Sequence, residues 1–245
     1  MKRHFVAALA ALAILPQLAA AQSGEGMWGA RIRIAPVVTI SPAFKQIGEA
    51  FVGTTNGISV HDYEVRFAHG FGVGVTGQLR MWDRFSIMGS GMFTSRGDGE
   101  LIDFDDEVRY EIDGTNQIMA TAGISMSLRE FEPDLQLRRL NASVHVAPAI
   151  VHDRPSAETF TPAQSAVAFT YAAANIGAQA EMPIANNKMA FVLGIDDYLI
   201  LWDDSKARHR VEGYMQWTNP GAVVDVESRR SHMWSFHAGL SWRFF

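Results

Sequence analysis

Residues 236–245 have the sequence Phe236-His237-Ala238-Gly239-Leu240-Ser241-Trp242-Arg243-Phe244-Phe245. In an extended strand, successive side chains point to opposite faces. One face of residues 236–244 therefore carries only apolar side chains, whereas the other carries a histidine, a glycine, a serine and an arginine. Helical spacing does not produce this pattern, so the segment is predicted to be a β-strand.

The same alternation recurs earlier in the chain, over 32–34, 71–80, 118–128 and 140–148. In a soluble β-sandwich the polar face is solvated and usually rich in Lys, Glu and Thr. Here that face consists mostly of Gly, Ser, Thr, Ala and Asn, with an occasional Arg, His or Glu. Such a composition is typical of the crowded interior of a narrow barrel, and it predicts that the apolar face contacts lipid.

The composition agrees with a membrane barrel. The 245 residues are 48% hydrophobic and 19% charged, with a mean hydropathy of +0.01. This is too apolar for a disordered chain and too evenly mixed for a helical membrane protein. The chain has no cysteine, which excludes a disulfide framework and any thiolate chemistry.

Residues 1–21 have the features of a secretory signal peptide: basic Lys2 and Arg3, an apolar run over 5–15, and small residues before Gln22. A membrane anchor would need about 18 consecutive apolar residues, and Pro16 interrupts the run. We therefore expect a single barrel domain over 22–245, exported by a Sec-type route. Without Lys2 and Arg3 the remaining 19 basic and 26 acidic residues give a net charge of −7, which disfavours nucleic acid as a partner.

Eight membrane strands are predicted, at 28–40, 62–80, 85–96, 116–129, 137–150, 166–182, 188–202 and 232–245. Each reaches the roughly 9–11 residues that a spanning strand needs. Short links at 81–84 and 183–187 contrast with long polar links at 41–61, 97–115, 151–165 and 203–231. We expect the short links and both termini on the periplasmic side, because outer-membrane barrels have tight periplasmic turns and longer outer loops.

The last long link leaves a second strand count open. Segments 210–217 and 222–227 could pair as a hairpin across Thr218-Asn219-Pro220-Gly221, which would allow ten strands. We favour eight membrane strands, with this hairpin as an extracellular flap.

The C-terminal segment resembles the β-signal of Gram-negative outer-membrane barrels: a polar residue, a glycine two positions later, and hydrophobic residues at a spacing of two that end on an aromatic. The residues that carry this resemblance are His237, Gly239, Leu240, Trp242, Phe244 and Phe245. The additional Phe245 is a departure, because the family usually stops at the first aromatic. The mature chain is similar to the small eight-stranded barrels, such as the membrane domain of outer-membrane protein A and the opacity-type adhesins.

This resemblance implies an all-β, antiparallel up-and-down transmembrane barrel in the Gram-negative outer membrane. It also implies the barrel-assembly machinery and periplasmic chaperones as partners during biogenesis, and outer-membrane lipid and lipopolysaccharide as the surroundings. We expect a monomer.

Extending the alternation inward predicts a charged network in the lumen. Its members are Arg31, Arg33, Arg66, Arg80, His145, Glu181, Asp196 and Arg243, with Gln78, Asn141 and His237 beside them. Charges of both signs in a narrow interior must pair, because an unpaired one costs several kcal/mol. We therefore expect a salt-bridged plug and a structural or surface-interaction role. A narrow channel or carrier for small or hydrophobic solutes is the alternative, since wider lumens belong to larger barrels.

No enzymatic site, metal site or cofactor is predicted. The histidines fall in no spacing such as H-E-x-x-H, and His61 and Asp62 point to opposite faces of a strand. A lipid-A-modifying enzyme is the weakest alternative. Barrels of the deacylase kind carry His-x-Ser, whereas here only the reverse order occurs, in 143–145 and 235–237, and both pairs are predicted to face the lumen.

The link at 97–115 contains eight acidic residues, for which solvation is the simpler interpretation and divalent-cation capture the sharper one.

Five tryptophans lie near predicted strand ends and are expected to form interfacial girdles. They are Trp28, Trp82, Trp202, Trp234 and Trp242.

Overall fold

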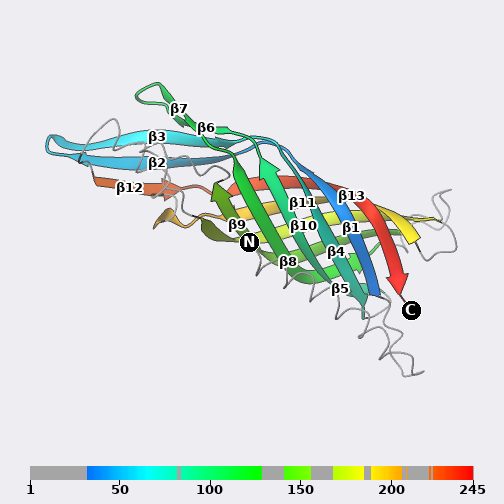
Figure 1. Ribbon diagram of the computed structural model, residues 1–245. Helices are drawn as coiled ribbons and strands as arrows, with labels where there is room; N and C mark the ends of the chain where they lie inside the picture. Colours follow the sequence, from blue (N-terminus) through cyan, green and yellow to red (C-terminus); the bar gives the residue numbers. More distant parts are fainter. Residues whose placement is uncertain are drawn as a thin grey trace.

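The computed structural model describes residues 32–81, 84–128, 141–155, 168–184, 189–205, 208, 221 and 223–244. Within this part of the chain, eight antiparallel strands close into a barrel, and five more form a second sheet beyond one of its ends (Figure 1). No helix among these residues is long and apolar enough to cross a membrane.

The barrel strands follow one another around the wall with each strand hydrogen-bonded to its neighbours. In that order they are β1 (Ile32–Ser41), β13 (Ser231–Phe244), β11 (Met189–Leu201), β10 (Phe169–Ile184), β9 (Asn141–Pro155), β8 (Thr115–Ser127), β5 (Phe85–Arg96) and β4 (Gly70–Arg80). Closure is made by β1, whose Ile34 is the register partner of Trp242 on one side and of Gly77 on the other. The predicted eight-stranded antiparallel barrel is confirmed.

The two faces of the barrel wall differ as the alternation predicts. On β13, Phe236 is 45% exposed whereas the next residue, His237, is 4% exposed. Every barrel strand contributes large exposed apolar side chains to the outer face. One example from each strand is Val38, Val73, Phe93, Ile118, Val146, Ile176, Leu193 and Phe236. A continuous apolar outer face is what a barrel in a bilayer requires.

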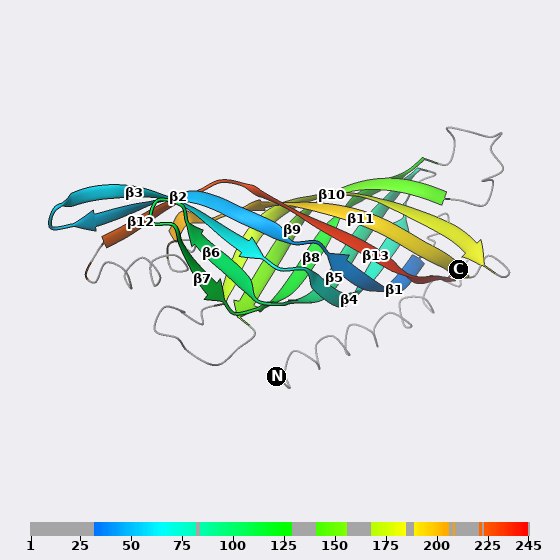
Figure 2. The ribbon, with the colours of Figure 1, turned by 90° about the horizontal axis from the view of Figure 1, so that it is seen from above.

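The second sheet has the strand order β12 (Val223–Ser228), β2 (Phe44–Thr54), β3 (Gly57–Phe67), β6 (Gly99–Asp103) and β7 (Val108–Ile112). Figure 2 shows β2, β3 and β12 projecting together from one end of the barrel. We call this end the sheet end, and the opposite end, which carries the tight turn between β4 and β5, the turn end. Strands β2 and β3 form a hairpin. Because β2 follows β1 and β3 precedes β4, this hairpin continues the neighbouring barrel strands β1 and β4 beyond the barrel.

This sheet corrects three predictions. The segment 62–80 is not one membrane strand, because the chain leaves β3 at Phe67 and enters β4 at Gly70. The expected loop 41–61 forms β2 and part of β3, and the acidic link 97–115 contains the β6–β7 hairpin. Alternation is the same for a strand inside the membrane and one beyond it, so the pattern did not separate them.

The expected flap is also changed. Residues 223–228 form a strand, but this strand pairs with β2, through contacts such as Val224 with Val52. Its predicted partner, 210–217, lies outside the described residues, as do the predicted signal peptide 1–21 and Phe245.

Candidate functional site

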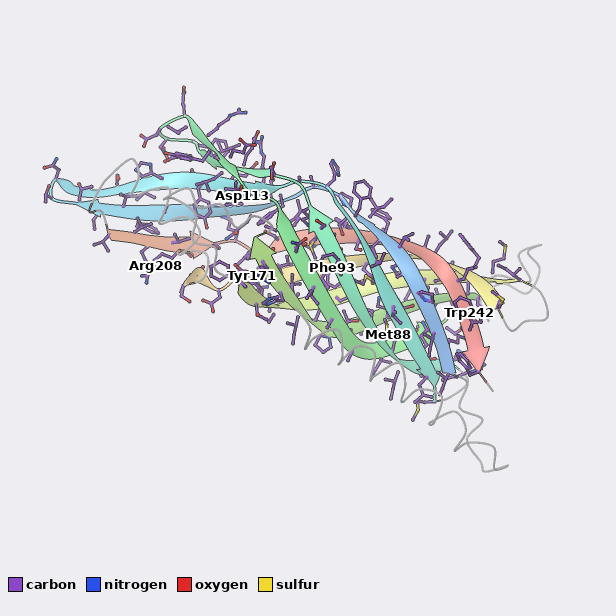
Figure 3. The ribbon with its side chains drawn as sticks, viewed as in Figure 1. Met88, Phe93, Asp113, Tyr171, Arg208 and Trp242 are labelled. Carbon is purple, nitrogen blue, oxygen red and sulfur yellow. The ribbon has the colours of Figure 1, made fainter. Side chains whose placement is uncertain are left out.

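Aromatic side chains fill the mouth of the barrel at the sheet end. The rings of Phe44 and Phe67 stack with centroids 4.4 Å apart, and Phe67 lies 6.4 Å from Trp202. Trp202 in turn meets Tyr171 edge to face at 4.6 Å, and its indole N–H donates to Ser231 Oγ at 2.8 Å. Figure 3 shows Tyr171 at this end of the barrel and Trp242 at the other. We call Phe44, Phe67, Tyr171 and Trp202 the aromatic lid.

Arg96 holds the lid to the two points where the chain passes from barrel to sheet. Its guanidinium lies 4.8 Å from the ring centroid of Phe44 and donates to the carbonyl oxygens of Pro42, at 3.1 Å, and Ala68, at 2.8 Å. A further hydrogen bond, 2.7 Å long, goes to Gln117 Oε1. Pro42 lies in the β1–β2 link and Ala68 in the β3–β4 link. The buried guanidinium of Arg96 therefore holds both links between the barrel and the second sheet.

Sequence reasoning missed the lid. Trp202 was expected in an interfacial girdle, but it continues the inward register of Tyr198 and Ile200 on β11 and packs against the core. The two-residue spacing of Tyr198, Ile200 and Trp202 is the sequence feature that could have predicted an inward-facing Trp202. By contrast, Trp234 and Trp242 lie on the outer face, 46% and 38% exposed. Trp28 and Trp82 are outside the described residues.

Apolar side chains line the lumen below the lid. Five of them are almost fully buried and come from four strands: Met119, Val151, Tyr198, Ile200 and Met233. These side chains pack in the sheet-end half of the lumen beside buried polar groups such as Gln117 and Asp153.

A buried carboxylate between two imidazoles lies further along the lumen. Asp196 Oδ1 is 2.7 Å from His145 Nε2, and Asp196 Oδ2 is 3.1 Å from His237 Nδ1. Asn175 Nδ2 also donates to Asp196 Oδ1, at 3.3 Å. A buried carboxylate needs such donors, because leaving it without partners costs several kcal/mol.

Two glycines make room for this histidine–aspartate cluster. Gly177 is the register partner of both His145 and Asp196, and a Cβ built there would overlap both side chains. A Cβ at Gly194 would likewise overlap the ring of His237, its partner on β13. Each imidazole therefore lies over a glycine of the neighbouring strand, where any larger residue would displace it.

A cross-lumen ion pair follows toward the turn end. Arg33 Nη1 on β1 is 2.6 Å from Glu181 Oε2 on β10, and Gln179 Nε2 donates to Glu181 Oε1 at 3.1 Å. Beyond it is a polar cavity of about 390 Å³ at the turn end. Residues lining it include Arg33, Gln78, Arg80, Arg84, Ser86, Ser125, Ser127, Asn141, Ser143 and Glu181.

The predicted lumen network is thus placed only in part. Arg33 and Glu181 meet, His145 and Asp196 meet, and Arg80 lines the cavity. Arg31 and the side chain of Arg243 lie outside what the structure describes.

The prediction that Arg66 belongs to the lumen network is wrong. This residue belongs to β3 of the second sheet, where Nε donates to Glu64 at 2.5 Å and Nη1 lies 3.8 Å from Glu100. The reason is the division of segment 62–80, which places Arg66 beyond the barrel.

The predicted β-signal residues occupy both faces of β13. His237 faces the lumen and Gly239 packs against Pro36 and Val37 of β1. The apolar members face outward and are partly exposed: Leu240, Trp242 and Phe244.

No family model matches the sequence, and neither does any curated protein. Solved structures do match. The outer membrane protein OprG from Pseudomonas aeruginosa has a TM-score of 0.61 and 8% sequence identity, over 89% of this chain and 98% of that chain. Neisserial surface protein A gives 0.45 and 9%, over 87% and 97%. Ail of Yersinia pestis gives 0.39 and 11%, over 86% and 98%. The similarity to OprG shows that the chain has the fold of a small outer-membrane barrel.

Proposed function

We propose that this protein is an integral outer-membrane barrel with a closed lumen, and that its second sheet serves a structural or surface-interaction role outside the cell. The observation that supports this most directly is the aromatic lid. Its members come from β2, β3, β10 and the end of β11, so the same side chains that anchor the second sheet also fill the barrel mouth.

The contacts below the lid support the same proposal. Buried apolar side chains from four strands pack below the lid, and the Arg33–Glu181 pair spans the lumen from β1 to β10. Moving one partner of a buried ion pair away from the other leaves a charge poorly solvated. Opening a path for solutes would therefore require breaking both the packing and the pairing.

The second sheet is the part best suited to contact with other molecules. It extends beyond the barrel in Figure 1, and its outer face exposes side chains of mixed character, among them Lys45, Ile58, Val60 and Asp62. A closed barrel with an extended sheet is suited to presenting a surface. We assign no catalysis to it: Ser235 and His237 are both buried in the lumen, away from any outer-leaflet acyl chain.

The outer face of β13 supports a location in the Gram-negative outer membrane. We propose Sec-type export, assisted by periplasmic chaperones, and insertion by the barrel-assembly machinery through the outward Leu240, Trp242 and Phe244. In the membrane the apolar outer face would meet lipid and lipopolysaccharide. The protein would act as a monomer.

Single-channel recording in planar bilayers tests the closed lumen. The wild-type chain is expected to give no steady conductance. The triple variant Phe67→Ala/Trp202→Ala/Arg33→Ala removes two lid rings and one partner of the cross-lumen ion pair, and it is expected to give measurable openings, which shows that the assay can detect a path. Steady conductance of the wild type would overturn the proposal.

That outcome would favour the second candidate, a narrow channel or carrier. The observation behind this candidate is the polar cavity at the turn end, which already provides about 390 Å³ on one side of the cross-lumen ion pair.

A further inference from the structure

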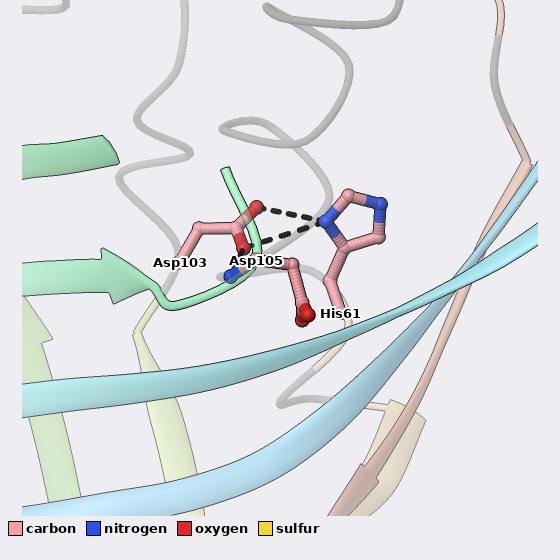
Figure 4. Close-up of side chains that lie close together, drawn as sticks. All are labelled: His61, Asp103 and Asp105. Carbon is pink, nitrogen blue, oxygen red and sulfur yellow. Dashed lines mark hydrogen bonds and ion pairs between the residues drawn. The ribbon is translucent and has the colours of Figure 1, made fainter. Parts of the chain in front are cut away.

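Side chains from two distant parts of the sequence converge on the second sheet, where β3 pairs with the end of β6. A ring nitrogen of His61 on β3 and a carboxylate oxygen from each of Asp103 and Asp105 lie within 4.8 Å of one another. Figure 4 shows the imidazole facing the two carboxylates. Two of the three are buried: His61 is 7% exposed and Asp103 is 2% exposed.

Backbone amides fix the two carboxylates. Asp103 Oδ1 accepts the N–H groups of Asp105, at 3.1 Å, and Asp106, at 3.3 Å. Asp105 Oδ2 accepts the N–H of Asp62 at 2.7 Å. Each carboxylate therefore has one oxygen engaged by the backbone, which holds both groups near the imidazole.

A chain of hydrogen bonds outside the cluster, from His61 through Ser59 to Val52, orients the imidazole. His61 Nε2 is 2.9 Å from Ser59 Oγ, and Ser59 Oγ donates to the carbonyl oxygen of Val52 at 3.4 Å. When the Ser59 hydroxyl donates to Val52, Nε2–H can donate to Ser59, and this tautomer leaves the lone pair on Nδ1. Nδ1 is the atom that faces Asp103 Oδ2, at 3.1 Å. Metal-binding histidines commonly donate their second ring N–H to a neighbour in this way.

In this tautomer a cation between Nδ1 and Asp103 would bind both the lone pair and the carboxylate. Asp106 Oδ2 lies 3.9 Å from the same nitrogen and adds a further negative charge nearby. In the other tautomer Nδ1–H donates an ordinary hydrogen bond to Asp103. It would leave Asp105 outside the interaction, although that carboxylate is held against the same point.

We propose that His61, Asp103 and Asp105 form a binding site for Zn²⁺ on the second sheet. Imidazole nitrogen with carboxylate oxygens is a zinc donor set, whereas Ca²⁺ and Mg²⁺ select oxygen donors. Bond lengths of about 2.0–2.2 Å require ligand atoms roughly 3.5 Å apart. Asp105 is the exposed member and can close the remaining distance by rotating its side chain.

This site is more specific than the run of eight acidic residues in the 97–115 link, because it includes a histidine from another strand. Other acids of the link have partners elsewhere: Glu100 pairs with Arg66, and Asp98 accepts the N–H of Gly114. Asp103 and Asp105 meet a buried histidine from another strand, with Asp106 at 3.9 Å from it. The sequence pattern did not indicate this pair, because His61 and Asp103 are 42 positions apart and meet only through the pairing of β3 with β6.

Isothermal titration calorimetry tests the site on the full chain, folded in detergent micelles and treated with a chelator. ZnCl₂ is expected to bind once per chain, and CaCl₂ and MgCl₂ are expected to bind at least tenfold more weakly. His61→Asn and Asp105→Asn should each weaken Zn²⁺ binding by tenfold or more, and Ser59→Ala by about tenfold. His69→Asn alters an exposed histidine of the neighbouring link and should leave binding unchanged.

Heat-modifiable migration on a gel reports whether each variant has folded. Because Asp105 is exposed, Asp105→Asn keeps the test decisive even where His61→Asn does not fold. The proposal is overturned if the wild type does not bind Zn²⁺, if Asp105→Asn binds it equally well, or if Ca²⁺ binds as tightly as Zn²⁺. None of these residues belongs to the lid or the lumen, so the conductance test of the proposed function succeeds or fails independently.

Discussion

Asp196 accepts a hydrogen bond from His145 at 2.7 Å, although the two residues lie on strands that are not neighbours. Strand β10 runs between them, and its Gly177 is the register partner of both. The bond crosses β10 at the one residue type that has no side chain to obstruct it. The buried charge of the lumen therefore depends on a glycine of a third strand.

Replacing that glycine should disturb the cluster. Gly177→Ala places a Cβ against both His145 Nε2 and Asp196 Oδ1, and we expect the free energy of unfolding to fall by about 1–3 kcal/mol. Urea unfolding in lipid vesicles measures this. Gly91→Ala on β5 is the matched control, because a Cβ there meets nothing within 4 Å. Equal effects of the two variants would contradict the role of Gly177.

The cross-lumen ion pair should contribute to stability through its geometry as well as its charge. Arg33→Met removes the charge-assisted hydrogen bond to buried Glu181 and is expected to lower the free energy of unfolding by about 1.5–3 kcal/mol. Arg33→Lys keeps the charge but loses the planar guanidinium, and it should fall between wild type and Arg33→Met. A variant series with no change in the urea midpoint would exclude a stabilising role for the pair.

The second sheet should lose stability in acid through Glu64. Burial of this carboxylate acts to raise its pKa, but hydrogen bonds from Arg66 and Lys45 outweigh that effect, so the pKa lies below the ordinary value of 4.5. A lowered folded-state pKa stabilises the fold above pH 4.5, and that stabilisation is lost as the pH falls through the folded value. The unfolding free energy should therefore decrease between pH 5 and pH 3.

Glu64→Gln is the control for this pH dependence, because the amide keeps the shape of the side chain and cannot ionise. The variant should be less stable than the wild type at pH 7 and should lose less stability on acidification. If both chains respond equally to pH, other carboxylates account for the loss.

Arg96 should couple the second sheet to the barrel. Arg96→Leu leaves the carbonyls of Pro42 and Ala68 without their buried donor, at a cost of about 1–3 kcal/mol. We expect backbone amides of β2 and β3 to exchange hydrogen roughly tenfold faster, while those of β10 and β11 keep their protection. Hydrogen exchange with mass spectrometry resolves these segments. Uniform acceleration across all strands would instead indicate general destabilisation.

The alternation in the sequence was sufficient to predict the barrel and the two faces of its wall. Phe236 and His237 fall on the faces that the pattern assigned, as do the inward Arg33, His145 and Asp196. Within a strand, the face on which a side chain lies depends only on whether its position is odd or even. Inward residues of the barrel strands such as Arg33, His145 and Asp196 could therefore be predicted, whereas the aromatic lid could not.

The pattern could not separate the barrel from the second sheet. Alternation continues through β3 into β4, so Arg66 looked like a lumen residue and 41–61 like a loop. What distinguishes β3 from β4 is the strand on the other side of each: β3 pairs with β6, whereas β4 pairs with β5. Strand pairing is a long-range property that one segment does not encode.

The sequence by itself determined that the chain is a barrel, and which side chains face inward, because the two-residue period of a strand is local. Only the tertiary structure decided which of those side chains meet. Arg33 reaches Glu181 across 148 positions, and Trp202 reaches Phe67 only after the sheet folds over the mouth. Barrel closure and strand register set these distances, and both depend on all strands at once.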